Sequence, residues 1–174
     1  MNKKYDYRNC QSLFGYAQSV HRKSGAICQL CDCGMNQQID FDLWRQMTVE
    51  HLIGESQGGY LHQIRDAIAQ KFSDLTSMEQ ERLSLRIDDA NTVTACSFCN
   101  ATTSRDVHPK TISELLEELN GSPDEIVNSI IKELQEILSR KRICVQWKLE
   151  YIRDAFNRMV LPELNKTRSN QGAP

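Results

Sequence analysis

The 174-residue sequence lacks several features that would assign it to a common class of protein. Its uninterrupted apolar runs are only a few residues long, whereas a transmembrane helix needs about 20, so we expect no membrane span. No apolar segment follows the N-terminal lysines, so we expect no export signal. Repeats and low-complexity stretches are also missing. The sequence therefore predicts an ordinary globular protein of the cytoplasm.

A strong net charge is missing as well. Lys and Arg total 21 against 23 Asp and Glu, and the resulting charge of −2 argues against strong non-specific binding to nucleic acid. The charge is unevenly placed, because residues 140–168 hold 8 basic and 3 acidic side chains, whereas residues 61–120 hold 6 basic and 10 acidic ones. The basic segment is either a solvated helix face or a surface that contacts phosphates.

Cysteine, in contrast, is abundant, with seven residues in the chain. An odd count without an export signal favours metal binding or free thiols over a disulfide framework. Two Cys-x-x-Cys pairs, Cys28/Cys31 and Cys96/Cys99, supply the four thiolates of a tetrahedral structural zinc site. Cys33 is a competing ligand, although the Cys-x-x-Cys spacing favours Cys31. The alternative interpretation is a set of buried free cysteines.

Hydrophobic periodicity and capping residues predict an α+β fold. We expect strands over 47–53 and 92–95. Residues 61–87 are expected to be helical, with a second helical piece that begins at residue 77. Further helices are expected over 5–23, 96–106, 112–119, 123–141 and 145–160. Ser122-Pro123 is typical of a helix start, and Pro162 is expected to end the last helix. Residues 1–110 would form the core with a helical insertion (60–90), and residues 111–174 a helical C-terminal segment.

Polar residues follow a defined order between the cysteine pairs. Glu50-His51 ends the first predicted strand, Asn91 opens the second, and Asn100 directly follows the last cysteine of the second pair. The order Cys-x-x-Cys, Glu-His, Gly-Gly, Asn, Cys-x-x-Cys-Asn over residues 25–106 resembles the HNH endonucleases, which have the ββα-metal fold. The nine-residue step from Asn91 to Asn100 equals the family's step from the motif asparagine to the metal ligand on the helix.

The resemblance implies a role for each of these residues. Glu50 and Asn100 would hold a catalytic Mg²⁺ or Mn²⁺, His51 would be the general base, and Asn91 would hold the motif loop and orient the imidazole. The chemistry agrees, because a neutral imidazole can take a proton from water at pH 7, and carboxylate and amide oxygens suit these ions. The implied activity is metal-dependent hydrolysis of phosphodiester bonds in DNA. Such proteins of this size occur as effectors in bacterial anti-phage defence or restriction.

A second interpretation is a non-catalytic module, stapled by zinc, that binds nucleic acid or protein through its C-terminal helices. Apolar residues in 145–160 recur every three to four positions, a spacing that suits a helix-in-groove contact. On either interpretation we expect a protein partner or a homo-oligomer formed through the C-terminal helices.

Overall fold

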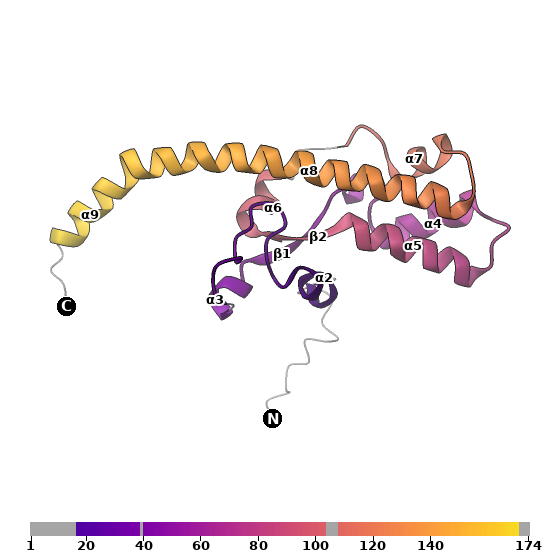
Figure 1. Ribbon diagram of the computed structural model, residues 1–174, viewed down its shortest axis with the longest axis horizontal. Coiled ribbons are helices and arrows are strands. Elements are labelled where there is room, and N and C mark those ends of the chain that lie inside the picture. Colours follow the sequence, from indigo (N-terminus) through magenta and orange to yellow (C-terminus); the bar gives the residue numbers. More distant parts are fainter. Residues whose placement is uncertain (1–16, 39, 104–107, 171–174) are drawn as a thin grey trace, which may run out of the picture.

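The computed structural model describes residues 17–38, 40–103 and 108–170, and the fold is α+β and mostly helical. Over these residues the sheet consists of two antiparallel strands, β1 (Met47–His51) and β2 (Thr92–Cys96) (Figure 1). The helices are α2 (Ala17–Ser24), α3 (Phe41–Trp44), α4 (Leu61–Lys71), α5 (Ser77–Asn91), α6 (Ser97–Thr103), α7 (Ile112–Glu118), α8 (Pro123–Ala155) and α9 (Leu161–Asn170), with the short turn η2 (Glu55–Gln57) after β1 and the π-helical segment η3 (Phe156–Val160) after α8.

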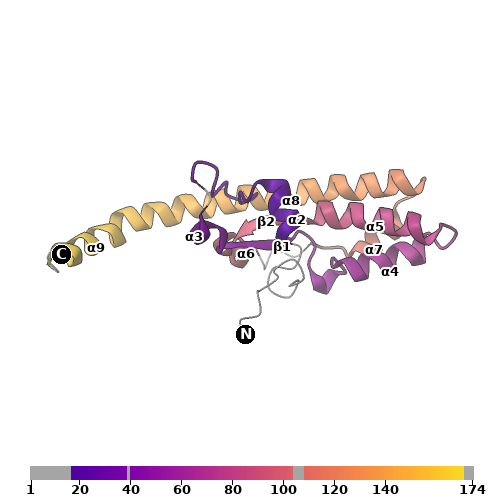
Figure 2. The same cartoon turned by 90° about the horizontal axis from the view of Figure 1, so that it is seen from below.

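The larger hydrophobic core lies in a helical bundle at one end of the molecule. Helix α5 packs between α4 and α8, and α7 packs on both α4 and α8 (Figures 1 and 2). Leu83 and Ile87 of α5 and Ile130 and Leu134 of α8 are at most 1% exposed. Each such buried side chain stabilises the fold by about 1.5–3 kcal/mol relative to an exposed one, so this bundle fixes the position of α8.

A smaller core surrounds the cysteine-containing turns. Leu30, Leu43 and Met47 pack there with the cysteines, and Val145 reaches this core from the middle of α8. Helix α8 therefore runs across both cores and connects the bundle to the sheet.

The sheet register brings the expected motif residues close together. His51 pairs with Thr92 and Met47 pairs with Cys96, so the end of β1 lies beside the start of β2. The insertion between the strands contains α4 and α5, and α6 follows β2 directly and packs on both strands. The predicted strands 47–53 and 92–95 correspond to β1 and β2 within two residues.

The C-terminal helices differ from the prediction. The expected helices 123–141 and 145–160 are one continuous helix as far as Ala155, because residues 142–144 contain no glycine or proline to interrupt it. Pro162 does not end the helix either. It lies in the first turn of α9, directly after the π-helical segment η3, where Leu161 N donates to Phe156 O, and a missing N–H is best tolerated in a first turn.

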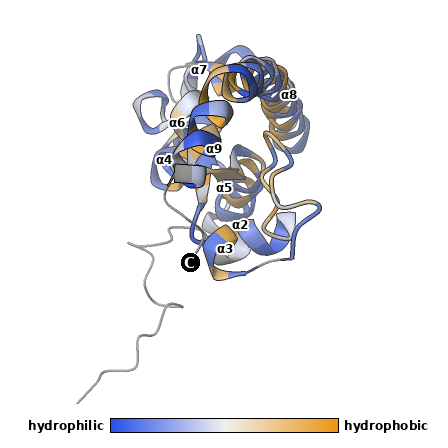
Figure 3. Ribbon diagram, turned by 90° about the vertical axis from the view of Figure 1, so that its left-hand side faces the viewer, coloured by the Kyte–Doolittle hydropathy of each residue, from blue (hydrophilic) through white to orange (hydrophobic). Residues whose placement is uncertain are grey.

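The end of α8 together with η3 and α9 forms an arm that projects from the body (Figure 1). Every residue from Tyr151 to Ser169 is exposed. The arm carries both hydrophilic and hydrophobic positions, as the end-on view shows for α9 (Figure 3). Over the described residues, no helix is both long and apolar enough to cross a membrane. Most of the helix expected over 5–23, together with Cys10 and residues 104–107, lies outside the described residues.

Candidate metal centre and catalytic pocket

Four cysteines from distant parts of the chain meet at one point. The Sγ atoms of Cys28, Cys31, Cys96 and Cys99 all lie within 4.8 Å of one another, and three of these residues are buried. Cys33, the competing ligand of the sequence analysis, is not part of this group, and Cys144 is exposed on α8. Four thiolates at this separation can hold a structural metal such as Zn²⁺.

The turn that carries the first cysteine pair is held against β2. Gln29 N donates to Thr94 O at 2.8 Å, and Thr94 N donates back to Gln29 Oε1 at 3.0 Å. Asp32 N donates to Cys28 O at 2.9 Å, with Asp32 in the left-handed region at φ +60°. The backbone therefore positions the first cysteine pair beside the second.

The protonation of the thiols also favours a bound cation. Hydrogen bonds from Cys31, Cys96 and Cys99 hold the pKa of Cys28 far below its usual value, while contacts with the same group of thiols raise the pKa of Cys99. Deprotonation of all four sulfurs in this mostly buried position requires a positive charge among them, which a zinc ion supplies.

A pocket of about 280 Å³ opens beside the end of β1. It is lined by side chains from β1, the following loop, α6 and α8, among them Glu50, His51, Glu55, Tyr60, Asn100 and Lys141. Three of the four residues that the HNH resemblance assigns to catalysis therefore share one cavity.

His51 is the last residue of β1, and its ring packs on Tyr60. The two ring centroids are 4.5 Å apart and the rings are tilted by 35°. Burial lowers the pKa of the His51 imidazole to about 4, so the ring is neutral at pH 7. A neutral imidazole can accept a proton, but this lowered pKa makes His51 a weaker base at pH 7 than an imidazole with a pKa near 7.

Asn91 is fully buried at the end of α5 and ties down the loop that follows His51. Its Oδ1 accepts from Ile53 N at 2.8 Å, and its Nδ2 donates to Ile53 O at 3.0 Å and to Gly59 O at 2.8 Å. Gly59 has no room for a side chain, because a Cβ there would lie 1.7 Å from Ile53 O. These bonds fix the backbone of the motif loop.

Glu50 has a partner that the sequence analysis did not identify. Its Oε1 accepts from Lys141 Nζ at 2.6 Å and from Thr103 Oγ1 at 3.2 Å. Glu50 is 6% exposed and Lys141 is 2% exposed, so the ion pair is buried. In the sequence, Lys141 is one of the eight basic residues of the segment 140–168. Its place on the buried stripe of α8, seven residues after Leu134 and four before Val145, is the pattern that could have revealed it.

Asn100, in α6, faces the same pocket. Its Nδ2 donates to Thr48 Oγ1 at 2.9 Å and to Val49 O at 3.4 Å, so Oδ1 is the atom that could bind a cation. A carboxylate and an amide oxygen on one cavity fit Mg²⁺ or Mn²⁺ in donor chemistry. The fit is incomplete in charge, because the ammonium of Lys141 already neutralises Glu50.

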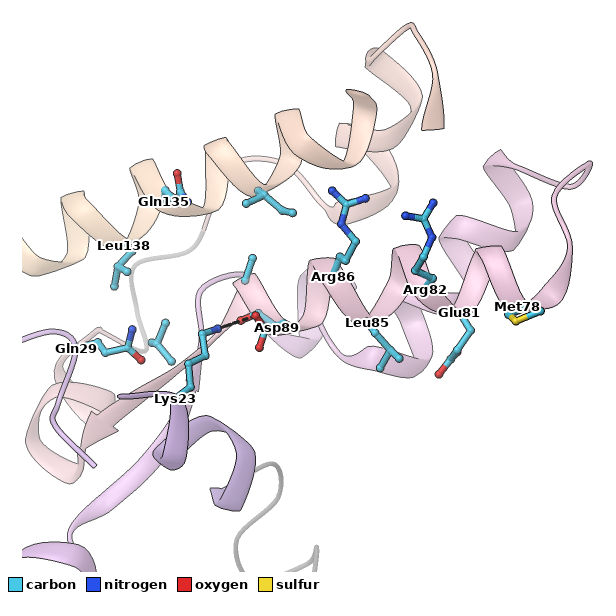
Figure 4. Close-up of a pocket in the computed structure, with 13 residues that line it drawn as sticks. Lys23, Gln29, Met78, Glu81, Arg82, Leu85, Arg86, Asp89, Gln135 and Leu138 are labelled. Carbon is cyan, nitrogen blue, oxygen red and sulfur yellow. Dashed lines mark hydrogen bonds and ion pairs between the residues drawn. The ribbon is translucent and has the colours of Figure 1, made fainter. Parts of the chain in front are cut away.

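A second, larger groove of about 870 Å³ lies between α5 and α8 (Figure 4). Leu85 and Leu138 contribute apolar surface to it, and Lys23 pairs with Asp89 at 3.0 Å across one end. The lining residues do not include the cysteines or the polar residues of the motif, so this groove is separate from the candidate catalytic pocket.

The chain matches no family model, no curated protein and no solved structure, so these comparisons assign it neither a family nor a function.

Proposed function

We propose that the chain is a metal-dependent endonuclease of the HNH type that hydrolyses phosphodiester bonds in DNA. The observation that supports this proposal is the shared pocket of Glu50, His51 and Asn100, with Asn91 holding the adjoining loop. A four-cysteine cluster adjoins the same strands, and the order β1, β2, α6 agrees with a ββα unit. The resemblance to the family extends this to an effector in bacterial anti-phage defence or restriction.

In the proposed reaction, the neutral imidazole of His51 takes a proton from the attacking water. Packing on Tyr60 limits the orientations of the ring, and the pairing of His51 with Thr92 fixes its backbone. A Mg²⁺ or Mn²⁺ ion held by Glu50 and Asn100 would neutralise charge on the phosphate and stabilise the leaving 3′ oxygen. A zinc ion at the four cysteines would have only protein ligands and would therefore be structural.

The test is cleavage of supercoiled plasmid by the purified full chain, with zinc content measured beforehand. Mg²⁺ or Mn²⁺ is added to metal-free buffer, so that no chelator removes the structural zinc. His51→Ala is expected to lose about 10²–10⁴-fold in rate, as is typical for a missing general base. His62→Ala is the matched control, because His62 is exposed on α4 and does not line the pocket.

The proposal is wrong if zinc-loaded wild-type protein leaves DNA intact with both ions. It is also wrong if His51→Ala cleaves as fast as His62→Ala, because the nuclease in the preparation would then be another protein or would use another base.

The buried ion pair favours one second candidate, a zinc-stapled module without catalysis. In that case Glu50 and Lys141 satisfy each other permanently, and the C-terminal arm makes the functional contacts through exposed residues such as Tyr151 and Phe156. This candidate predicts binding of DNA or protein by the full chain without cleavage, and no effect of His51→Ala on that binding.

A further inference from the structure

The buried pair of Lys141 and Glu50 joins two residues that are 91 positions apart in the sequence. Removing two charges from water is costly, and the cost is recovered only where the groups face each other with good geometry. Here Nζ and Oε1 are 2.6 Å apart, and Thr103 Oγ1 also donates to Oε1. The pair is therefore a specific buried contact of this fold and not a chance surface contact.

Lys141 is held in place by the helix that carries it. Ile137 precedes it in the bundle core, and Val145 follows it in the core around the cysteines. The next residue, Arg142, donates to Gln29 O at 2.7 Å and pairs with Asp32 at 3.0 Å, both in the first cysteine turn. Helix α8 is thus anchored on both sides of Lys141.

The charge of Lys141 opposes a metal ion at Glu50. A divalent cation bound to this carboxylate would lie close to the ammonium group, and unit charges of like sign a few Å apart repel each other strongly where water is scarce. The lysine side chain has a flexible four-carbon stem, so rotation about its bonds can move Nζ away from Glu50 while the helix stays in place.

We propose that Lys141 is the internal counter-ion of Glu50 that a divalent cation must displace, so that α8 sets the metal affinity of the pocket. This inference rests on the proposed function, because it assumes that Glu50 is a metal ligand.

The experiment measures Mn²⁺ binding to the full, zinc-loaded chain by the electron paramagnetic resonance of free Mn²⁺, without any assay of cleavage. Lys141→Met removes the charge and keeps an unbranched side chain that is one atom shorter. Lys141→Gln keeps a donor for Glu50 Oε1 in case the methionine variant does not fold. Lys148→Met is the matched control on α8, because Lys148 is exposed and donates to Thr102 O. The double variant Glu50→Gln/Lys141→Met measures Mn²⁺ binding to a pocket that lacks both charges.

Loss of the ammonium is expected to lower the dissociation constant for Mn²⁺ about tenfold or more in both Lys141 variants, whereas Lys148→Met leaves it unchanged. The double variant should bind Mn²⁺ more weakly than Lys141→Met. Equal affinity for Mn²⁺ in wild type, Lys141→Met and Lys141→Gln, with weaker binding in the double variant, overturns the inference and keeps the metal site. Absence of Mn²⁺ binding in all of these proteins overturns both the metal site and the inference.

Discussion

Substitution of Asn91 by Asp tests whether this side chain holds the motif loop. The change keeps the shape of the side chain and the acceptor for Ile53 N, but it replaces the Nδ2 donor by an oxygen that faces the carbonyls of Ile53 and Gly59. Each buried polar group left without a partner costs about 1–3 kcal/mol, so two carbonyls give about 2–6 kcal/mol. A domain is typically stable by about 5–15 kcal/mol, so Asn91→Asp should remove a large part of the free energy of unfolding.

The measurement is urea denaturation followed by far-UV circular dichroism at pH 5 and pH 7. In the folded state the carbonyls favour a protonated carboxyl, which raises its pKa above that in the unfolded chain, so the destabilisation should be smaller at pH 5 than at pH 7. Asn157→Asp, at an exposed position of the arm, is the matched control and should change little. If Asn91→Asp unfolds within about 0.5 kcal/mol of the wild type, the loop is not held by Asn91.

Three further predictions follow from the cysteine cluster, a buried carboxyl and the arm. Cys96→Ser should abolish tight zinc binding and unfold the sheet region, as checked by metal analysis and circular dichroism; folded wild-type protein without zinc would contradict this. Burial raises the pKa of Asp88 to about 6, and its Oδ1 has no hydrogen-bond partner among the described residues. The folded state therefore favours the protonated carboxyl, and the free energy of unfolding falls as the pH rises from about 4 to 6. Asp88→Asn should therefore raise the free energy of unfolding at pH 7.5 by about 1–3 kcal/mol and leave it nearly unchanged at pH 4, and equal effects at both pH values would argue against a titrating Asp88. Light scattering should show an oligomer for the full chain and a monomer after deletion of residues 151–174, with the same thermal midpoint for the remaining helices; a monomeric full chain would exclude the homo-oligomer.

Local sequence patterns predicted the elements whose ends are set by capping residues. Ser122 caps α8 by accepting from Glu125 N, and Glu125 Oε2 accepts from Ser122 N in return, as the Ser-Pro-Asp-Glu run indicates. Thr111 and Glu114 make the same reciprocal pair at the start of α7. The Cys-x-x-Cys spacing likewise identified the residues that meet in the cysteine cluster. In each case the partners are close in sequence or share a ligand chemistry, so their spacing in the sequence is enough to predict the contact.

Contacts that depend on how α8 packs against the rest of the fold could not be predicted in this way. The sequence predicted a break between residues 141 and 145, although nothing in the backbone chemistry of 142–144 interrupts a helix. The packing of His51 on Tyr60 also depends on the path of the loop, which Asn91 and Gly59 determine together. Such contacts follow from tertiary geometry and not from periodicity.

Lys141 shows where sequence and structure have to be combined. A lysine is almost never fully buried unless it is paired, so a lysine on the stripe of Leu134, Ile137 and Val145 requires a buried acid nearby. The chain offers 23 acidic residues, and only the packing of α8 across the sheet selects Glu50 among them. The ammonium of Lys141 neutralises Glu50, so the proposed metal ion would gain the full charge of this carboxylate only after Lys141 has moved away. If Glu50 binds the proposed metal ion, the affinity of the pocket would therefore depend on α8 as much as on the strand that carries Glu50.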